Sequence, residues 1–446
     1  MKSFPDYIKN ELPKWPTWLN NILLHCNFFK GAVYGRGYAQ MEKEIVNIDP
    51  EKKLLEMVNY AIRHVKYYRD HYGNLSINSI KEFEEKIGFI DKDEVMAHWS
   101  DFLVDNIDWS KCVTGTTGGT SGKPLKLVLP KNRYIHSLAF WHKQLKWFGW
   151  NYDARAVIRN HKLDANRKYI INPITKEFIF DAFRMSPQYA KEVWRVMYRN
   201  KIKFLHAYPS AAFQFLKFCY KQDLNLNFLK VCILTSEGIT PEQHQFIQGT
   251  LGLKICASYG HSEKLIQAIS APDRDSLIVE EGYGYCEIID KKGHVIREEG
   301  ANGELVGTTF FNRYMPLIRY RTGDYAEYIR PKDNHYAPSR ELKEVKGRWD
   351  KNIIFKGDGS TTSITALNMH SDLYEKIDGL QFIQKKKGEL IVLIIKGENF
   401  DEETARDFSL FYQKVLGETT KIRIQYVEKL IFQPNGKFLP LISYVN

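Results

Sequence analysis

Cysteine is scarce in this sequence of 446 residues, and the six cysteines are spread along the chain. None of them forms a CxxC pair, and no Cys/His cluster has the spacing of zinc ligands. This pattern favours reduced, mostly buried thiols over a disulfide framework or a zinc finger. Such thiols are typical of a cytoplasmic protein, and we expect this localisation here.

Long hydrophobic runs are also missing. The start of the chain has no apolar stretch of the signal-peptide kind, and the longest apolar stretches, such as 390–395, are far too short to span a bilayer. Residues 18–29 have the pattern of an amphipathic helix. We favour a helix packed on the main domain, and the alternative is peripheral attachment to the inner membrane.

The balance of charges is basic, with 64 Lys and Arg against 53 Asp and Glu and a net charge of +11. A positive protein favours anionic partners, such as nucleotides, coenzymes, acidic sugars, nucleic acid or a membrane surface. The charge is scattered, and its densest run, 385–387, predicts a solvated turn. Nucleic acid is therefore only a weak alternative, and we predict no nucleic-acid partner.

The length predicts more than one core, since domains commonly contain ~100–200 residues. In the middle of the chain apolar runs alternate with helical patterns, which indicates a parallel sheet. Helical periodicity also continues through 52–72 and 80–99, and the chain becomes strand-rich from about 283. We expect strands at 154–159, 202–207, 230–234 and 254–258, and helices at 211–220 and 241–251.

The composition changes after position 351. Strands are expected at 380–384, 389–396 and 421–427, with a helix at 402–416 that stops at Gly417. This order predicts a small α+β domain. The predicted fold class is therefore α/β, with a large N-terminal domain of mixed sheets and helices, 1–350, and a small α+β C-terminal domain, 351–446.

Residues 114–124 read TGTTGGTSGKP and contain four glycines and five hydroxyl residues. Glycine lets backbone N–H groups approach an anion closely, and hydroxyls and lysine add donors and charge. The loop is neither a Walker A motif, because Pro124 follows Gly122-Lys123, nor a Rossmann GxGxxG. We predict phosphate binding rather than a flexible linker, by Thr117, Gly118, Gly119, Thr120, Ser121, Gly122 and Lys123.

With this loop the chain resembles the adenylate-forming superfamily of acyl-CoA synthetases, peptide-synthetase adenylation domains and luciferase. After Pro124 the chain has Leu before Lys126, one place later than the usual pattern. That spacing is similar to the phenylacetate–CoA ligase and CapK branch. The resemblance extends over most of the chain, because four more motifs follow in the family's order.

Two of these motifs imply nucleotide contacts. Residues 258–263, SYGHSE, resemble the YGxTE motif, which places Tyr259 and Gly260 against adenine and Glu263 on Mg²⁺. Residues 320–324, YRTGD, resemble the Y(R/K)TGD motif almost letter for letter, and imply that Asp324 accepts hydrogen bonds from the ribose hydroxyls. A turn capped by an aspartate would not require the whole pentapeptide.

Two further motifs imply the moving parts, because the resemblance makes the small C-terminal domain, 351–446, a mobile lid. In GRWD, 347–350, the resemblance assigns Arg348 to ribose or phosphate and Asp350 to the hinge. In PNGK, 434–437, it assigns Lys437 as the mobile catalytic lysine, although a lone NGK is usually a surface turn. The resemblance also places the loop of Ser236, Glu237 and Gly238 along the adenine edge.

The acyl pocket is less sharply indicated. The resemblance places His206, Tyr208 and His261 beside the substrate, while His206 is equally well explained as a satisfied core histidine. Some aryl-CoA ligases of this group carry a Cys/His zinc cluster after the YGxTE motif. Here 267–281 contains neither Cys nor His, so we predict no structural zinc.

The resemblance implies an ATP- and Mg²⁺-dependent, AMP-forming ligase that adenylates a small carboxylic acid and transfers the acyl group to an acceptor. The favoured acceptor is an amine or sugar-linked amine, in capsule or O-antigen polysaccharide biosynthesis. The alternative is an aryl- or acyl-CoA ligase like phenylacetate–CoA ligase, with CoA as acceptor. A nucleotide-binding module without catalysis is the competing class, which the retained Glu263, Asp324, Arg348 and Lys437 disfavour.

Overall fold

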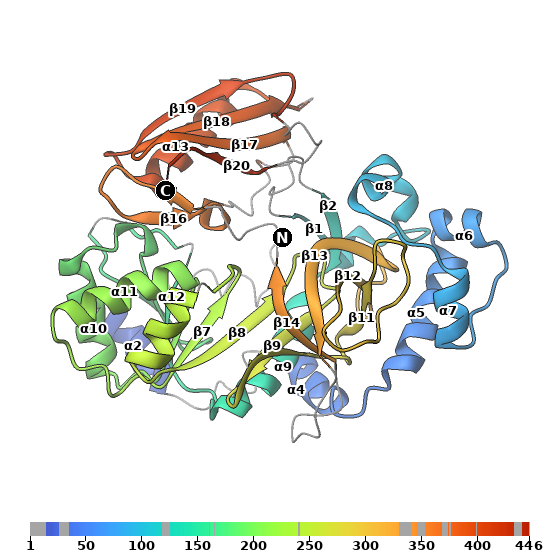
Figure 1. Ribbon diagram of the computed structural model, residues 1–446, viewed down its shortest axis with the longest axis horizontal. Helices are drawn as coiled ribbons and strands as arrows, with labels where there is room; N and C mark the ends of the chain where they lie inside the picture. Colours follow the sequence, from blue (N-terminus) through green and yellow to red (C-terminus); the bar gives the residue numbers. More distant parts are fainter. Residues whose placement is uncertain are drawn as a thin grey trace.

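The computed structural model is organised around one large mixed sheet, with a smaller sheet beside it (Figure 1). It describes residues 15–25, 35–117, 125–329, 340–346 and 353–445, apart from positions 160, 165, 240, 368–372, 374–375, 398 and 432–438. The described strands of the large sheet follow the order β11 (Gly284–Ile289), β12 (Asn302–Thr309), β13 (Tyr320–Ile329), β14 (Glu341–Lys346), β10 (Arg274–Val279), β9 (Gln267–Ala271), β8 (Lys254–Gly260), β7 (Val231–Thr235), β6 (Phe204–Ala207), β3 (Arg155–Ile158), β5 (Glu177–Phe180) and β4 (Ile170–Asn172).

The strands from β8 to β5 are parallel neighbours, as the alternation of strands and helices predicts. Helices α10 (Pro187–Arg199) and α11 (Pro209–Lys221) lie against one face of them, where they share an apolar core with β3, β6 and β7. The opposite face packs against α9 (Arg133–Leu145) and residues 148–152 that follow it. Both faces are covered, so these strands are almost entirely apolar.

The strands from β9 to β14 pair antiparallel and confirm the strand-rich pattern after 283. Their core is shared with the N-terminal helices and with the hairpin of β1 (Cys112–Thr116) and β2 (Lys126–Pro130). The helices are α5 (Pro50–His64), α6 (Lys66–Tyr72), α7 (Ile80–Lys86) and α8 (Lys92–Ala97), while α4 (Gly35–Glu44) packs against α9 in a separate apolar cluster.

Two predicted helices are interrupted, and a third changes its helix type. Val65 is extended and pairs with Val104, so 52–72 forms two helices with a break between them. In 80–99 the break comes at Ile90, whose N–H donates to the carbonyl of Arg319, 3.2 Å away, beside β13. The third helix, α12 (Pro241–His244), continues as a π-helix, Gln245–Thr250. Helical periodicity passes through such breaks because the tertiary partners are distant in sequence.

The C-terminal part forms a separate sheet of β19 (Lys421–Tyr426), β18 (Glu389–Lys396), β17 (Ile377–Lys386) and β20 (Leu441–Ser443), covered by α13 (Glu402–Leu416). A short hairpin, β15 (Ile353–Phe355) and β16 (Thr361–Ser363), joins it. The predicted strands and helix of this part are confirmed. Their apolar core also contains Phe183 and Tyr208 of the large domain, so the two parts pack together.

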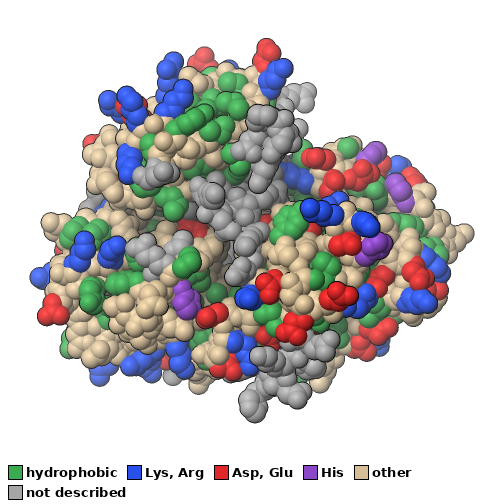
Figure 2. Space-filling view, viewed as in Figure 1, with side chains coloured by type: hydrophobic (Ala, Val, Ile, Leu, Met, Phe, Trp, Pro, Cys, Tyr) green, Lys and Arg blue, Asp and Glu red, His purple; other side chains and the backbone are tan. Residues whose placement is uncertain are grey.

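Basic side chains gather over β19, where Lys421 and Arg423 are exposed, while the rest of this face mixes acidic and basic groups (Figure 2). Lys385, Lys386 and Lys387 are exposed at the end of the β17–β18 hairpin, as expected for a solvated turn. The scattered charge of the sequence is thus also scattered on this face of the molecule.

Helix α2 (Thr17–His25) packs on the large domain, which confirms the favoured interpretation for the described part of the segment, while 26–29 lie outside the described residues. Asn20 is buried and donates from Nδ2 to the carbonyl of Ile171 in β4, 3.2 Å away, and Leu24 lies in the apolar core. Trp18, 67% exposed, and Ile22 leave an apolar outer face. Among the described helices, none has the length and apolar character needed to cross a membrane.

Candidate functional site

The predicted site residues gather where the parallel strands end. In the register of the sheet Ile158 pairs with Ala207, Ala207 with Leu234, and Thr235 with Ser258. The next residues of these strands therefore lie along one edge, the carboxyl edge at which α/β sheets commonly bind ligands. They are Arg159, Tyr208, Ser236 and Tyr259.

Two of the predicted nucleotide motifs are in contact. The Tyr259 hydroxyl in β8 donates to Oδ2 of Asp324 in β13, at 3.0 Å. Asp324 is only 5% exposed, and its N–H donates to the Thr322 hydroxyl at 3.1 Å. Burial, reinforced by the Asp324 charge, raises the pKa of Tyr259 well above its usual range, so the phenol remains a donor.

The other residues of the YRTGD motif hold Asp324 in place through contacts with the neighbouring strand. Gly323 has a positive φ of 73°, a conformation that favours glycine, and its N–H donates to Oε1 of Glu304 at 3.1 Å. Arg321 forms an ion pair with the same carboxylate at 2.5 Å. The hydroxyl of Thr322 donates to the carbonyl of Leu305 at 2.8 Å. Every residue between Tyr320 and Asp324 is therefore fixed to the neighbouring strand β12.

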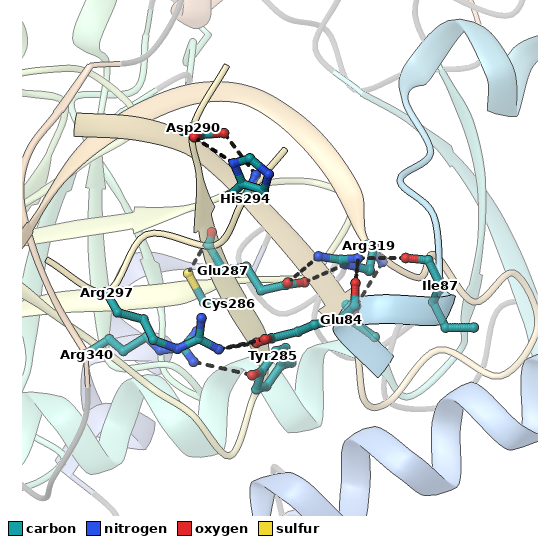
Figure 3. Close-up of polar contacts among 11 residues, drawn as sticks. Glu84, Ile87, Tyr285, Cys286, Glu287, Asp290, His294, Arg297, Arg319 and Arg340 are labelled. Carbon is teal, nitrogen blue, oxygen red and sulfur yellow. Dashed lines mark hydrogen bonds and ion pairs between the residues drawn. The ribbon is translucent and has the colours of Figure 1, made fainter. Parts of the chain in front are cut away.

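Arg319, directly before the motif, is a buried anchor (Figure 3). It is 2% exposed, has a φ of 51°, and its Nη2 lies 2.8 Å from Oε1 of Glu287. Its Nη1 donates to the carbonyls of Ile87 and Glu84, at 2.6 and 3.1 Å. Burial raises the pKa of Glu287 despite the opposing effect of Arg319. This network holds the start of β13 against the break between α7 and α8.

Glu263 and His261 face each other at the end of the 258–263 motif. Oε2 of Glu263 lies 3.5 Å from Nδ1 of His261, and both side chains are largely buried. Protein-bound Mg²⁺ commonly takes one or two carboxylates together with substrate phosphates. The buried Glu263 carboxylate fits a magnesium ion held jointly with a nucleotide, beside the Tyr259–Asp324 contact.

Glu237 has a structural contact that the motif does not reveal. Its two carboxylate oxygens accept hydrogen bonds from the N–H and the hydroxyl of Ser210, at 3.0 and 3.1 Å. Helix α11 has no side-chain cap from its own N-cap residue, Tyr208. Glu237 therefore caps this helix from the loop that follows β7. Ser236, with a φ of 70°, and Gly238 are exposed beside it.

His206 lies between the sheet and α9. It is 7% exposed, and its ring centroid is 5.2 Å from that of Trp141. Its Nε2 is 3.3 Å from Nη1 of Arg159, whose guanidinium also lies over the Tyr208 ring at 5.2 Å. Burial, with Arg159 and Arg155 nearby, lowers the pKa of His206 well below its usual range. His206 is therefore neutral and buried, with Arg159 as a polar partner.

Arg159 is the residue that the sequence analysis missed at this edge. Its Nη2 donates to the Ser236 hydroxyl at 3.4 Å, so it joins the ends of β3, β6 and β7. The available signal is its position, since it is a cationic residue directly after the buried strand Arg155–Ile158.

The base of the predicted phosphate loop is a closed hairpin. The Thr117 N–H donates to the Leu125 carbonyl, and the Leu125 N–H donates to the Thr117 hydroxyl, both at 2.9 Å. Strand β2 begins directly after Leu125. Several predicted site residues lie outside the described part of the chain: Gly118, Gly119, Thr120, Ser121, Gly122, Lys123, Arg348, Asp350 and Lys437.

A cavity of about 570 Å³ lies at the other ends of the strands. Its lining includes Leu229 and Lys230 before β7, and Leu253 before β8. It therefore shares no residue with the carboxyl-edge group.

Comparison with known proteins finds similar sequences for the C-terminal part and for most of the chain. Residues 356–443 match the family of the CapK C-terminal domain. Protein CapK of Staphylococcus aureus is 20% identical over 409 residues, which are 86% of each chain. Phenylacetate-coenzyme A ligase of Aromatoleum evansii is 30% identical over 132 residues, and this match spans 29% of each chain.

A solved structure shows the same fold. It is 2-hydroxyisobutyryl-CoA ligase in complex with 2-HIB-AMP and CoA, with a TM-score of 0.56, 16% identity, and coverage of 91% of this chain and 90% of that one. The resemblance drawn from the motifs is thereby confirmed. The chain is similar in sequence to phenylacetate-coenzyme A ligases and to CapK, its residues 356–443 match the CapK C-terminal domain, and it has the α/β fold of the structural neighbour, with a large N-terminal and a smaller C-terminal domain.

Proposed function

We propose that this protein is an AMP-forming ligase that activates a carboxylic acid with ATP and transfers the acyl group to an amine or thiol. The hydrogen bond between Tyr259 and Asp324 carries the proposal, because it joins two nucleotide motifs that are 65 positions apart. It lies at the carboxyl edge of the sheet, together with Glu263 and the end of β7.

Each residue has a role in binding ATP. The Asp324 carboxylate accepts from the ribose hydroxyls, Tyr259 orients it, and the loop of 118–124 donates to the phosphates from its closed base at Thr117. Gly260, Ser236 and Gly238 lie along adenine. Glu263 would hold Mg²⁺, which when bound neutralises charge on the phosphates.

The first half-reaction requires no general base, because the nucleophile is already a carboxylate. Its oxygen attacks the α-phosphorus of ATP, the bond to the β-phosphate oxygen breaks, and pyrophosphate leaves with the electron pair. Arg348 and Lys437 stabilise the charge of this transition state. An amine or thiol then attacks the acyl carbon, and AMP departs.

A movement of the C-terminal part would separate the two half-reactions. Residues 351–446 form the lid in this proposal, 1–350 the main domain, and Asp350 the hinge. Rotation would withdraw Lys437 and open the acceptor site. The basis is the resemblance to the family rather than a second conformation.

The acceptor is proposed as an amine on a sugar, in capsule or O-antigen biosynthesis, because CapK matches over most of the chain. The exposed Trp18 and Ile22 would provide a peripheral contact with the inner membrane. The second candidate is CoA, which a structural relative binds in its complex with an acyl adenylate.

The decisive test is incubation with ATP, Mg²⁺, a panel of carboxylic acids and hydroxylamine, which traps acyl adenylates as hydroxamates. We expect Lys437→Ala to abolish acid-dependent pyrophosphate exchange while largely sparing acyl transfer from a supplied adenylate. Lys429→Ala, an exposed lysine eight positions earlier, is the control and should exchange normally.

Unchanged exchange in Lys437→Ala would refute the role of this lysine. Absence of exchange with every acid would support a nucleotide-binding module without catalysis. The product assay, run with CoA and with amines, separates the two acceptors.

A further inference from the structure

Arg159 carries a charge that the described protein does not neutralise. Its polar contacts are His206 at 3.3 Å and the Ser236 hydroxyl at 3.4 Å, and Tyr208 lies against its guanidinium. Among the described residues no carboxylate forms an ion pair with it, whereas Arg155, four positions earlier, pairs with Glu177 at 2.6 Å. The uncompensated cation therefore lies at the carboxyl edge.

Two donors of this cluster have no hydrogen-bond partner in the described part of the chain. They are Nε of Arg159 and Nδ1 of His206, and both atoms are buried. Because a guanidinium can only donate, Nε2 of His206 must accept from Arg159, which puts the proton of the neutral ring on Nδ1. Buried donors without partners are costly, which favours a ligand that supplies acceptors.

The charged and aromatic groups around the cluster favour an anion. His161 is held neutral, since burial lowers its pKa, and Arg155 lies over the Trp141 ring at 4.8 Å. Trp141 and Tyr208 supply flat apolar walls beside His206 and Arg159. An oxygen-rich anion would meet one positive charge and could accept from the free N–H groups of Arg159 and His206, with aromatic rings beside it.

The position of the cluster assigns it to the acid rather than to the nucleotide. Arg159 follows β3 and Tyr259 belongs to β8, and two strands, β6 and β7, lie between them. At roughly 4.8 Å per step, the two strand ends are about 14 Å apart. The guanidinium reaches back over β6 only as far as Ser236, at the near end of the loop placed along adenine, and the rest of the cluster belongs to β6 and lies on the β3 side of the nucleotide motifs.

We propose that the acid activated by this enzyme carries a second anionic group, such as a carboxylate or phosphate, which Arg159 and His206 bind. This inference rests on the proposed adenylation and specifies its substrate class. The group that reacts with ATP lies toward Tyr259, and the second group lies at the end of β3. A simple aromatic or aliphatic monocarboxylate would leave Arg159 without a counter-charge.

The experiment measures pyrophosphate exchange with dicarboxylates and phosphorylated acids against monocarboxylates of matched length. We expect kcat/KM to be at least about 10-fold higher for the dianionic acids in the wild type. Arg159→Met should lower it about 10- to 100-fold for these acids alone, through KM, with the KM for ATP unchanged. Arg159→Lys should restore part of the preference, and the exposed Arg195→Met should have no effect.

Equal use of monocarboxylates by the wild type would overturn the inference, as would a uniform loss for all acids in Arg159→Met. An increase in the KM for ATP would assign the guanidinium to a nucleotide phosphate instead. Thermal-shift measurements with the same acids separate this inference from the proposed function. An Arg159-dependent shift without exchange would keep the anion site and refute the ligase, and no shift for any dianionic acid would refute the anion site.

Discussion

Two arginines distinguish the halves of the large sheet, the buried Arg319 and the half-buried Arg159. Arg319, in the antiparallel half, pairs with Glu287 and donates to two carbonyls. Arg159, in the parallel half, meets a neutral histidine and a serine, and one of its donors is unpartnered. Complete pairing fixes a strand in place, whereas incomplete pairing leaves a charge available to a ligand.

The largest expected effect is a loss of stability when the buried ion pair of Arg319 and Glu287 is broken. Arg319→Met leaves the Glu287 carboxylate buried without its partner, and we expect a loss of about 3–5 kcal/mol in the free energy of unfolding. Urea denaturation measures it. The double variant with Glu287→Leu removes both charges and should recover most of the loss, while Arg159→Met should cost less than about 1 kcal/mol. Equal losses in the free energy of unfolding for Arg319→Met and Arg159→Met would show that the two arginines do not differ in their contribution to stability.

Asp324, where the two halves meet, should govern nucleotide affinity. Asp324→Ala removes the ribose acceptor, and we expect ATP to bind about 10- to 100-fold more weakly, since hydrogen bonds to a charged group contribute ~1.5–3 kcal/mol. Calorimetric titration with ATP and Mg²⁺ measures this. Tyr259→Phe loses only the orienting hydrogen bond and should have a smaller effect. A normal ATP affinity in Asp324→Ala would refute the ribose contact.

The neutral His206 predicts a pH dependence of stability. Its pKa in the folded state is well below 6.5, so below about pH 6.5 the unfolded chain binds a proton that the folded chain does not. Stability is therefore complete above this pH and falls as the pH decreases, by up to about 1.4 kcal/mol per pH unit. His206→Asn should flatten the dependence in denaturation measured from pH 7 to 5.

A second histidine, His136, also contributes to the pH dependence of stability and has to be distinguished from His206. Burial lowers the pKa of His136 to about 4, which acts in the same direction. His136→Asn is therefore the matched control, and the two contributions should add. A slope that His206→Asn leaves unchanged would show that His206 is protonated in the folded protein.

The smallest expected effect concerns the cap of α11. Glu237→Ala removes both hydrogen bonds to Ser210 and should lower the free energy of unfolding by about 1 kcal/mol, with a smaller change in ATP affinity than in Asp324→Ala. Ser210→Ala, which retains the backbone bond, should cost less. A large loss of ATP affinity without destabilisation would instead make Glu237 primarily a nucleotide ligand.

Much of the fold could be predicted because the parallel strands are continuous apolar runs and the helices between them are amphipathic. The breaks at Val65 and Ile90 could not, because each depends on a partner distant in sequence, Val104 or the start of β13. The predicted domain limits at 350 and 351 fall outside the described residues and remain a proposal.

The candidate site divides in the same way. Tyr259 and Asp324 were predicted from motifs, and their contact supports the nucleotide site. Arg159 belongs to no motif, and only the register of β3, β6 and β7 brings it to the same edge. The capping role of Glu237 likewise depends on where α11 begins. A local pattern identifies chemistry that a family shares, but it cannot show which charge lacks a counter-charge after folding.

Tyr208 belongs to two environments at once. Its ring lies against Arg159, and it is also part of the apolar core of the C-terminal domain, next to the contact in which Nζ of Lys356 donates to the Phe183 carbonyl at 2.8 Å. Occupancy of the Arg159 cluster and docking of the C-terminal domain therefore share one side chain. Thermodynamic linkage makes such a connection reciprocal: if an acid that displaces this ring weakens docking by some factor, docking weakens acid binding by that same factor.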